Sequence, residues 1–198
     1  MNNVEYEAKF TNIDKDNIRE KLKAFGVSLI KPEFLQKRVV FNLPTGHEIQ
    51  GGWLRVRDEV DKITMSLKVV DGSRIEDQKE ICLNVDSFEE AEKFLRALGC
   101  QKKSYQENKR ELWRLKDVEI TIDEWPFIEP FIEIESTSEE KVKEAAEDLG
   151  FDYNQALFGA TDIICQKKYG ISLDIINSIS KISFGMENPY LKINKGKF

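Results

Sequence analysis

The stretch VEYEAKF, residues 4–10, decides how the rest of the chain is interpreted. In a β-strand successive side chains point to opposite faces, so this stretch predicts a strand with one apolar and one charged face. The apolar face carries Val4, Tyr6 and Ala8, and the charged face carries Glu5, Glu7 and Lys9. Spacing alone leaves two interpretations of the charged face open: a surface in contact with water, or one wall of a charged site.

Alternation of the same kind recurs along the chain, with turn signals between the runs. It predicts strands near residues 4–10, 34–42, 53–60, 63–70, 76–85, 103–115, 118–124 and 131–136. The connections at 58–62 and 115–117 suit antiparallel hairpins and are too short for parallel crossovers. The sequence therefore predicts an α+β fold, an eight-stranded antiparallel β-barrel with helices packed outside. A barrel of that size is filled by side chains or holds one small ligand.

Helical patterns interrupt the strands at about 14–25, 88–98 and 139–149, and a fourth helix is expected over 154–169. Ser87 precedes the second pattern with Glu90 three residues later, which is a capping-box signature. A glycine follows each of the first three patterns, as expected where a helix ends: Gly26, Gly99 and Gly150. From Ile171 onward the periodicity is weak.

Composition excludes several classes of protein. The 36 acidic and 30 basic residues give a net charge of -6, which disfavours a non-specific nucleic-acid binder. No apolar run approaches the roughly 20 residues that cross a bilayer, and the polar N-terminus predicts no secretory signal. The cysteines Cys82, Cys100 and Cys165 are odd in number and show no CxxC spacing, so neither a disulfide framework nor a zinc site is indicated. A cytoplasmic location is expected.

The charged faces of the predicted strands differ in sign. Arg55 and Arg57 share one face without an acid, whereas two other strands offer only acids: Glu119 and Asp123, then Glu133 and Glu135. Paired arginines bind phosphate oxygens bidentately, and clustered carboxylates bind Mg²⁺ or Mn²⁺. A site that uses both would take a polyanion together with a metal, which indicates phosphoryl chemistry. Periodicity does not determine whether these faces point inward.

Several motifs occur in a fixed order along the chain. They are ExExK (5–9), WLRVR (53–57), TMSLK (64–68), an acid at Glu80, KRELW (109–113), IDEW (122–125) and FIEIE (131–135). This ordered set resembles the CYTH family, also called triphosphate tunnel metalloenzymes. The resemblance runs from Val4 to about Tyr169. It implies that residues 1–170 form a tunnel domain whose polar strand faces point inward, and it leaves 171–198 as a C-terminal extension of unknown role.

The resemblance also implies roles for individual residues. It assigns metal binding to Glu5, Glu7, Asp123, Glu133 and Glu135, and it assigns triphosphate binding to Arg55, Arg57, Lys68 and Arg110. Lys9 would lie near the reacting phosphate, and Glu80 would orient a basic neighbour. The family often has KxR on the sixth strand, but here Asn108 holds the lysine position with Lys109 beside it. Either Lys109 replaces that lysine through a local bulge, or one phosphate contact is missing.

Three activities are compatible with the resemblance. The first hypothesis is a hydrolase, using Mg²⁺ or Mn²⁺, in which water attacks the terminal phosphate of tripolyphosphate, thiamine triphosphate or another organic triphosphate. The alternatives are a class IV adenylyl cyclase, which converts ATP to cyclic AMP and pyrophosphate, and a binding module without turnover. The expected partner is a small-molecule triphosphate, with no nucleic acid and no membrane, and formation of a homodimer stays open. Trp53, Trp113 and Trp125 either stack on adenine or, as we prefer, pack in the core.

Overall fold

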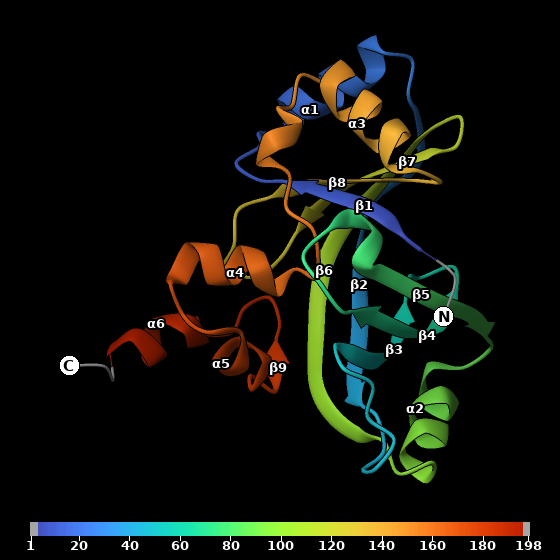
Figure 1. The fold of residues 1–198 in the computed structure, drawn as a ribbon, viewed down its shortest axis with the longest axis vertical. Coiled ribbons are helices and arrows are strands. Elements are labelled where there is room, and N and C mark those ends of the chain that lie inside the picture. The colour runs from blue at the N-terminus through green and yellow to red at the C-terminus, as the bar shows by residue number, and fades with distance from the viewer. Residues whose placement is uncertain (1–3, 196–198) are drawn as a thin grey trace.

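The computed structural model describes residues 4–195 (Figure 1). The elements follow in the order β1 (Tyr6–Phe10), α1 (Lys15–Ala24), β2 (Ser28–Asn42), β3 (Gly52–Asp58), β4 (Ile63–Val70), η1 (Ile75–Asp77), β5 (Gln78–Val85), α2 (Phe88–Ala97), β6 (Gln101–Leu115), β7 (Val118–Glu124), β8 (Phe131–Ser136), α3 (Glu139–Asp148), η2 (Tyr153–Gln155), α4 (Asp162–Tyr169), α5 (Leu173–Asn177), β9 (Lys181–Ile182) and α6 (Pro189–Lys195). None of the helices described is both long and apolar enough to span a membrane.

The strands β1 to β8 form one antiparallel sheet that curls strongly. Its order is β1-β8-β7-β6-β2-β3-β4-β5, so the first and the fifth strands of the chain lie at the two ends. These ends meet where Val4 forms an antiparallel bridge with Lys79 and the Glu5 N–H donates to the Gln78 carbonyl at 2.9 Å. The contact is confined to the start of the chain, so the curled sheet forms a barrel that is closed only in part. This confirms the barrel that the alternation predicts.

The helices cover the outside of the barrel, as expected. Ile18 and Leu22 of α1 and Val142 of α3 are buried against the outer faces of β1, β7 and β8. On the far side, Ala91 and Leu95 of α2 pack over β2, β3 and β4 (Figure 1). Burying a side chain such as Leu22 stabilises the fold by roughly 1.5–3 kcal/mol. Because the apolar faces of the strands pack against the helices outside the barrel, the polar faces line the interior.

The predicted helix ends are correct for the first three helices. Gly26, Gly99 and Gly150 have φ of +70°, +86° and +81°, a conformation that glycine adopts without a steric penalty. The Ser87 hydroxyl accepts the Glu90 N–H at 3.2 Å and so caps α2. These local signals are therefore sufficient to place the helices.

The fourth predicted helix, 154–169, is too long. In the structure η2 is a single 3₁₀ turn, and α4 begins only at Asp162. Between them Leu157 forms an antiparallel bridge with Lys9, and Gly159 has φ of +112°. The bridge holds this segment extended against β1, so tertiary pairing overrides the helical pattern.

The chain after Tyr169 is more ordered than its weak periodicity suggests. It contains α5, α6 and a ninth strand, β9, that the sequence does not predict. Strand β6 pairs with β7 only from Lys109 to Leu115, which leaves its first half open on that edge. There β9 pairs in parallel with Tyr105 and Gln106. The helices α5 and α6 contact α4 (Figure 1).

Candidate functional site

The barrel interior contains a cavity of about 190 Å³. Most of the predicted site residues line it: Glu5, Glu7, Lys9, Arg55, Arg57, Lys68, Glu80, Arg110, Glu133 and Glu135. The polar strand faces therefore point inward, which resolves the question raised by the charged face of residues 4–10. Asp123 and Lys109 are absent from this lining.

Three of the carboxylates that line the cavity lie close together. Oxygens of Glu5, Glu7 and Glu135 lie within 4.8 Å of one another. The register explains the grouping, because Glu7 of β1 is directly opposite Glu135 of β8. We call these residues the acidic trio. Carboxylate oxygens at this separation are ligands suited to a hard divalent cation.

The acidic trio is electrostatically crowded. Burial, followed by the charges of Glu5 and Glu7, raises the pKa of Glu135 to about 8. Burial also raises the pKa of Glu5 to about 7, against the attraction of Lys68 at 2.5 Å. Burial opposes ionisation of Glu7 as well, but there Lys68 and Lys9 prevail and lower its pKa to about 2. A cation added to the trio would favour the ionised form of the two raised carboxyls.

Two lysines contact the acidic trio. Lys9 is only 1% exposed; it forms an ion pair with Glu7 and lies 3.5 Å from Glu133. Burial opposes its charge, but those two carboxylates outweigh it and raise the pKa of Lys9. Lys68 approaches Glu80 at 3.6 Å, in addition to Glu5. Both lysines are therefore held as cations beside the acids.

A wall of arginines from β2 and β3 also lines the cavity. Arg55 and Arg57 of β3 face the cavity, and β2 brings Arg38 directly opposite Arg57. Burial, and then the charges of Arg55 and Arg57, lower the pKa of Arg38. Nearby acids neutralise part of this positive charge. Arg55 donates to Glu80 at 2.8 Å, and an Arg57 nitrogen lies 2.7 Å from Glu59. A group of cations this close favours the binding of an anion.

Asp123 and Glu133 accept hydrogen bonds from Arg110 and are not part of the acidic trio. Asp123 is 0% exposed and accepts Nε and Nη2 of Arg110 at 3.0 and 2.7 Å. Glu133 accepts a further bond from Arg110 Nη2 at 2.5 Å. The Thr121 hydroxyl also donates to Asp123, at 2.8 Å. These two acids, expected as metal ligands, thus position a guanidinium group in the structure.

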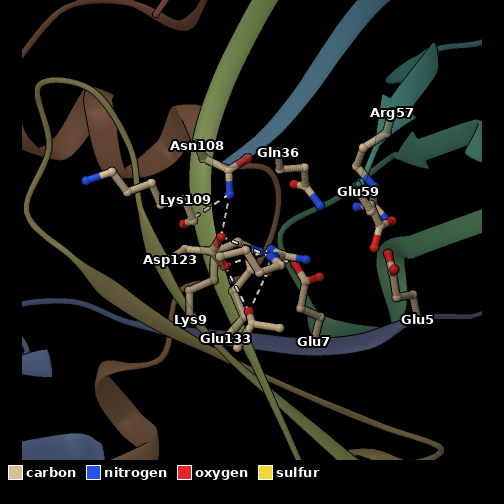
Figure 2. Close-up of polar contacts among 12 residues, drawn as sticks. Glu5, Glu7, Lys9, Gln36, Arg57, Glu59, Asn108, Lys109, Asp123 and Glu133 are labelled. Carbon is tan, nitrogen blue, oxygen red and sulfur yellow. Dashed lines mark hydrogen bonds and ion pairs between the residues drawn. The ribbon is translucent and has the colours of Figure 1, made fainter. Parts of the chain in front are cut away.

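Lys109 lies outside the cavity. It pairs with Glu124 at 3.1 Å and approaches the ring of Phe184 at 5.1 Å, and in Figure 2 it points away from the other labelled side chains. The register of β6 against β2 runs without a shift from Arg110 to Ser104, so no bulge turns this lysine inward. The interior position belongs to Asn108, which donates to Asp123 at 2.6 Å and accepts from Arg38.

Sequence reasoning did not single out Arg38, Gln36 or Glu59. Arg38 is buried, donates to Gln36 and Asn108, and lies 4.6 Å from the Trp125 ring. A usable signal existed, because Gln36 and Arg38 share one face of the predicted strand 34–42. Glu59 follows Arg57 at the same two-residue spacing and faces it in the structure (Figure 2).

Several buried donors at this wall have no hydrogen-bond partner among residues 4–195. Three of them belong to side chains that line the cavity: Arg38 Nε, Arg55 Nε and Arg57 Nε. Buried polar groups in proteins are nearly always paired, so such a convergence indicates a ligand rich in acceptor oxygens. The donors thus fit a polyanion, and the acidic trio fits a metal that accompanies it.

Comparison with known proteins gives a consistent result. The profile described as CYTH domain matches residues 2–163. A Methanocaldococcus jannaschii protein named as a candidate adenylate cyclase is 27% identical over 172 residues, which is 84% of this chain and 96% of that protein. A solved candidate adenylate cyclase of Vibrio parahaemolyticus is 14% identical, has a TM-score of 0.72, and aligns over 84% of this chain and 99% of that chain.

A second solved structure extends the comparison. It is a candidate adenylyl cyclase of Hippeastrum, reported with a dominant triphosphatase activity; it is 16% identical, has a TM-score of 0.52, and aligns over 86% of this chain and 99% of that chain. At these identities the solved structures show a shared fold.

Proposed function

Since the chain belongs to the CYTH domain family, we propose that it is a metal-dependent phosphohydrolase acting on a triphosphate inside the barrel. The observation that carries this proposal is that one cavity is lined by both the acidic trio and a wall of buried guanidinium groups. A single ligand that needs both is a polyanion accompanied by a hard cation. A triphosphate with Mg²⁺ or Mn²⁺ has this chemistry.

The acidic trio would hold the metal. Burial and mutual repulsion raise the pKa of Glu5 to about 7 and of Glu135 to about 8, and a bound divalent cation would lower both pKa values. When bound, the metal would offset charge on the phosphoryl oxygens and favour ionisation of a bound water. Mg²⁺ and Mn²⁺ both suit oxygen ligands.

The chain's own cations would hold the triphosphate. Arg38, Arg55 and Arg57 each present an unpaired Nε–H at the cavity wall, and a guanidinium group binds phosphate oxygens bidentately. Lys9, fixed between Glu7 and Glu133, would neutralise charge at the reacting phosphate. Glu80 would keep Arg55 in place. Such prearranged charges stabilise a transition state without reorganising during the reaction.

In the proposed reaction, a water oxygen bonds to the terminal phosphorus. The bond from that phosphorus to the bridging oxygen breaks, and the bridging oxygen leaves on the diphosphate. The products are orthophosphate, the diphosphate and one proton released to solvent. The Hippeastrum protein, which shares the fold and is reported with a dominant triphosphatase activity, supports this choice.

Cyclisation of ATP is the second candidate. The Methanocaldococcus jannaschii and Vibrio parahaemolyticus proteins are both named as adenylate cyclases. In that reaction the ribose 3′-hydroxyl attacks the α-phosphorus and pyrophosphate leaves. The same cations would serve either reaction, so the products distinguish the two.

The test is a parallel incubation with tripolyphosphate, thiamine triphosphate and ATP. Each substrate is incubated with Mg²⁺, with Mn²⁺ and with chelator, and the products are separated. We expect orthophosphate that depends on metal and is lost in Arg57→Ala, with Lys109→Ala as a control outside the cavity. Cyclic AMP with pyrophosphate would establish the cyclase instead. Tight binding with every substrate left intact would identify a binding module.

A further inference from the structure

Strand β1, which carries Glu5, Glu7 and Lys9, pairs with a neighbouring strand along only one of its edges. On that edge β8 runs antiparallel to the whole of β1. On the other edge, the described residues of β5 approach β1 only at its start, where the Glu5 N–H donates to the Gln78 carbonyl at 2.9 Å. The backbone of β1 beyond that contact therefore needs other partners on this edge.

The side chain of Gln78 continues the pairing that the backbone of β5 does not. Its Nε2 donates to the Glu7 carbonyl at 3.0 Å, and its Oε1 accepts the Gly159 N–H at 3.1 Å. These partners fix the orientation of the amide, because exchanging its oxygen and nitrogen would face carbonyl with carbonyl and N–H with N–H. Gln78 is 0% exposed. Its side-chain amide thus takes the place of a peptide group from a neighbouring strand.

The segment 157–159 completes this edge of β1. Lys9 and Leu157 exchange both of their backbone hydrogen bonds, at 2.9 and 3.0 Å. Two residues later Gly159 has φ of +112°, a conformation that glycine adopts without a steric penalty, and there its N–H donates to Gln78. The backbones of all three charged residues of β1 are therefore held: the first by the Gln78 main chain, the second by the Gln78 side chain and the third by Leu157.

Holding this edge determines where the carboxylates of the acidic trio lie. The direction of a side chain in a strand follows from the backbone of its own residue. Glu7 lies opposite Glu135 across the β8 edge, and Gln78 holds its carbonyl on the other edge. The trio's oxygens, within 4.8 Å of one another, repel when ionised. A loosened edge would let Glu5 and Glu7 move away from Glu135, and metal affinity depends on the groups that hold the ligands in place.

We propose that Gln78 is a positioning residue for metal binding, whose side-chain amide joins β1, β5 and the segment 157–159 and so holds Glu5 and Glu7 in place for a divalent cation. Gln78 does not line the cavity, so it acts through the backbone of β1. The inference rests on the proposed function in one respect, since it requires the acidic trio to bind the metal. It does not depend on which triphosphate is used or on which bond is broken.

The test is Gln78→Met, which approximately preserves the size of the side chain and removes both of its polar atoms. The backbone carbonyl that accepts the Glu5 N–H remains. We expect the Kd for Mn²⁺, measured by calorimetry without substrate, to rise about tenfold or more. The Kd for tripolyphosphate in chelator should change by less than about twofold, because the arginine wall is untouched.

Two controls separate positioning from a general loss of stability. Gln166→Met makes the same substitution at an exposed glutamine of α4 and should change neither Kd. Leu95→Ala removes a side chain of α2 that is 3% exposed and packs on the far side of the barrel. It should lower the Tm because it leaves a cavity, but it should leave the Kd for Mn²⁺ unchanged.

A measurement on the wild type does not depend on the folding of a variant. If holding this edge favours metal binding, then metal binding must in turn stabilise the edge, because coupling between two sites is reciprocal. Hydrogen exchange followed by mass spectrometry should therefore slow in Mg²⁺ for peptides that include residues 4–10 and 156–160. A peptide from α2 is the reference and should not change.

The outcomes separate this inference from the proposed function. A Kd for Mn²⁺ in Gln78→Met within about twofold of the wild-type value overturns the inference and leaves the proposed function standing. An equal rise in the Kd for tripolyphosphate, or the same rise for Mn²⁺ in Leu95→Ala, also overturns it, since the effect would then be one of general stability. If Gln78→Met does not fold, unchanged exchange in the wild type overturns it.

Two further results concern both proposals. A wild-type protein that binds neither Mn²⁺ nor Mg²⁺ overturns both. If Gln78→Met selectively loses affinity for Mn²⁺ while the wild type converts ATP to cyclic AMP and pyrophosphate, the inference holds and the proposed hydrolysis fails.

Discussion

Glu135→Gln should make the metal-free protein less sensitive to rising pH. In the fold, burial and the charges of Glu5 and Glu7 raise the pKa of Glu135 from 4.5 to about 8. The native state therefore keeps a proton that the unfolded chain has released, and stability falls as pH rises through that window. One pKa unit corresponds to 1.36 kcal/mol, so between pH 6 and pH 8 this carboxyl lowers the free energy of unfolding by roughly 2–3 kcal/mol.

The amide introduced by Glu135→Gln cannot ionise, so the variant avoids this loss. For a chain of this length 1 kcal/mol shifts Tm by roughly 2–4 °C. In chelator, the wild type should therefore lose about 5–10 °C between pH 6 and pH 8 through this group, and the variant should lose clearly less. Differential scanning calorimetry at both pH values measures the difference. Glu147→Gln, an exposed neutralisation on α3 with a side chain 55% exposed, is the control.

The same variant tests the metal site. A ligand at about 100 times its Kd stabilises a protein by roughly 2.7 kcal/mol, so Mn²⁺ should raise the Tm of the wild type at pH 8 by several degrees. Glu135→Gln should lose most of that shift. Equal pH slopes in chelator would show that the Glu135 carboxyl does not bind a proton in the native state. If Mn²⁺ raised the Tm of the variant as much as that of the wild type, Glu135 would not be a metal ligand.

Three further predictions concern the remaining site residues. Glu7→Gln should abolish metal-dependent turnover with an unchanged circular dichroism spectrum; retained activity would exclude Glu7 from the site. Arg38→Ala should weaken tripolyphosphate binding by about 10–100-fold, the value of a charge-assisted hydrogen bond, with little change in Mn²⁺ affinity by calorimetry, and the opposite pattern would contradict the assignment. The Kd for Mn²⁺ should fall as pH rises from 6 to 8, because metal binding displaces the protons held by Glu5 and Glu135; a Kd independent of pH would refute the crowded trio.

Alternation in the strands was sufficient to assign the faces of most site residues. Glu5, Glu7, Arg55 and Arg57 share faces that a two-residue period defines without reference to the rest of the chain. That these faces point inward does not follow from the period, because a strand whose apolar face packs under a helix has the same pattern. Here α1, α2 and α3 cover the outside, and the motif order supplied the missing information.

The partners of the charged residues could not be predicted in the same way. Asp123 pairs with Arg110 because β6 and β7 place them directly opposite, which depends on the register between two strands. Lys109 lies outside since it is one residue from an inward position in a strand without a bulge, and a shift of one residue reverses the face. The last elements were missed because α5 and β9 are short and are stabilised by contacts with β6 and α4 rather than by a periodic pattern of their own.

The small strand β9 has a consequence for the solution behaviour of the protein. At Tyr105 and Gln106 of β6 it pairs with backbone groups that would otherwise form an open sheet edge. The open edge of a sheet can pair with a strand from another molecule. The two residues of β9, which pack against neighbouring helices, block this pairing. A chain cut at the end of the CYTH profile, residue 163, would expose this edge together with the apolar surface under α5 and α6. The boundary recognised in the sequence family is therefore expected to yield a fragment that aggregates more readily than the chain continued through α6.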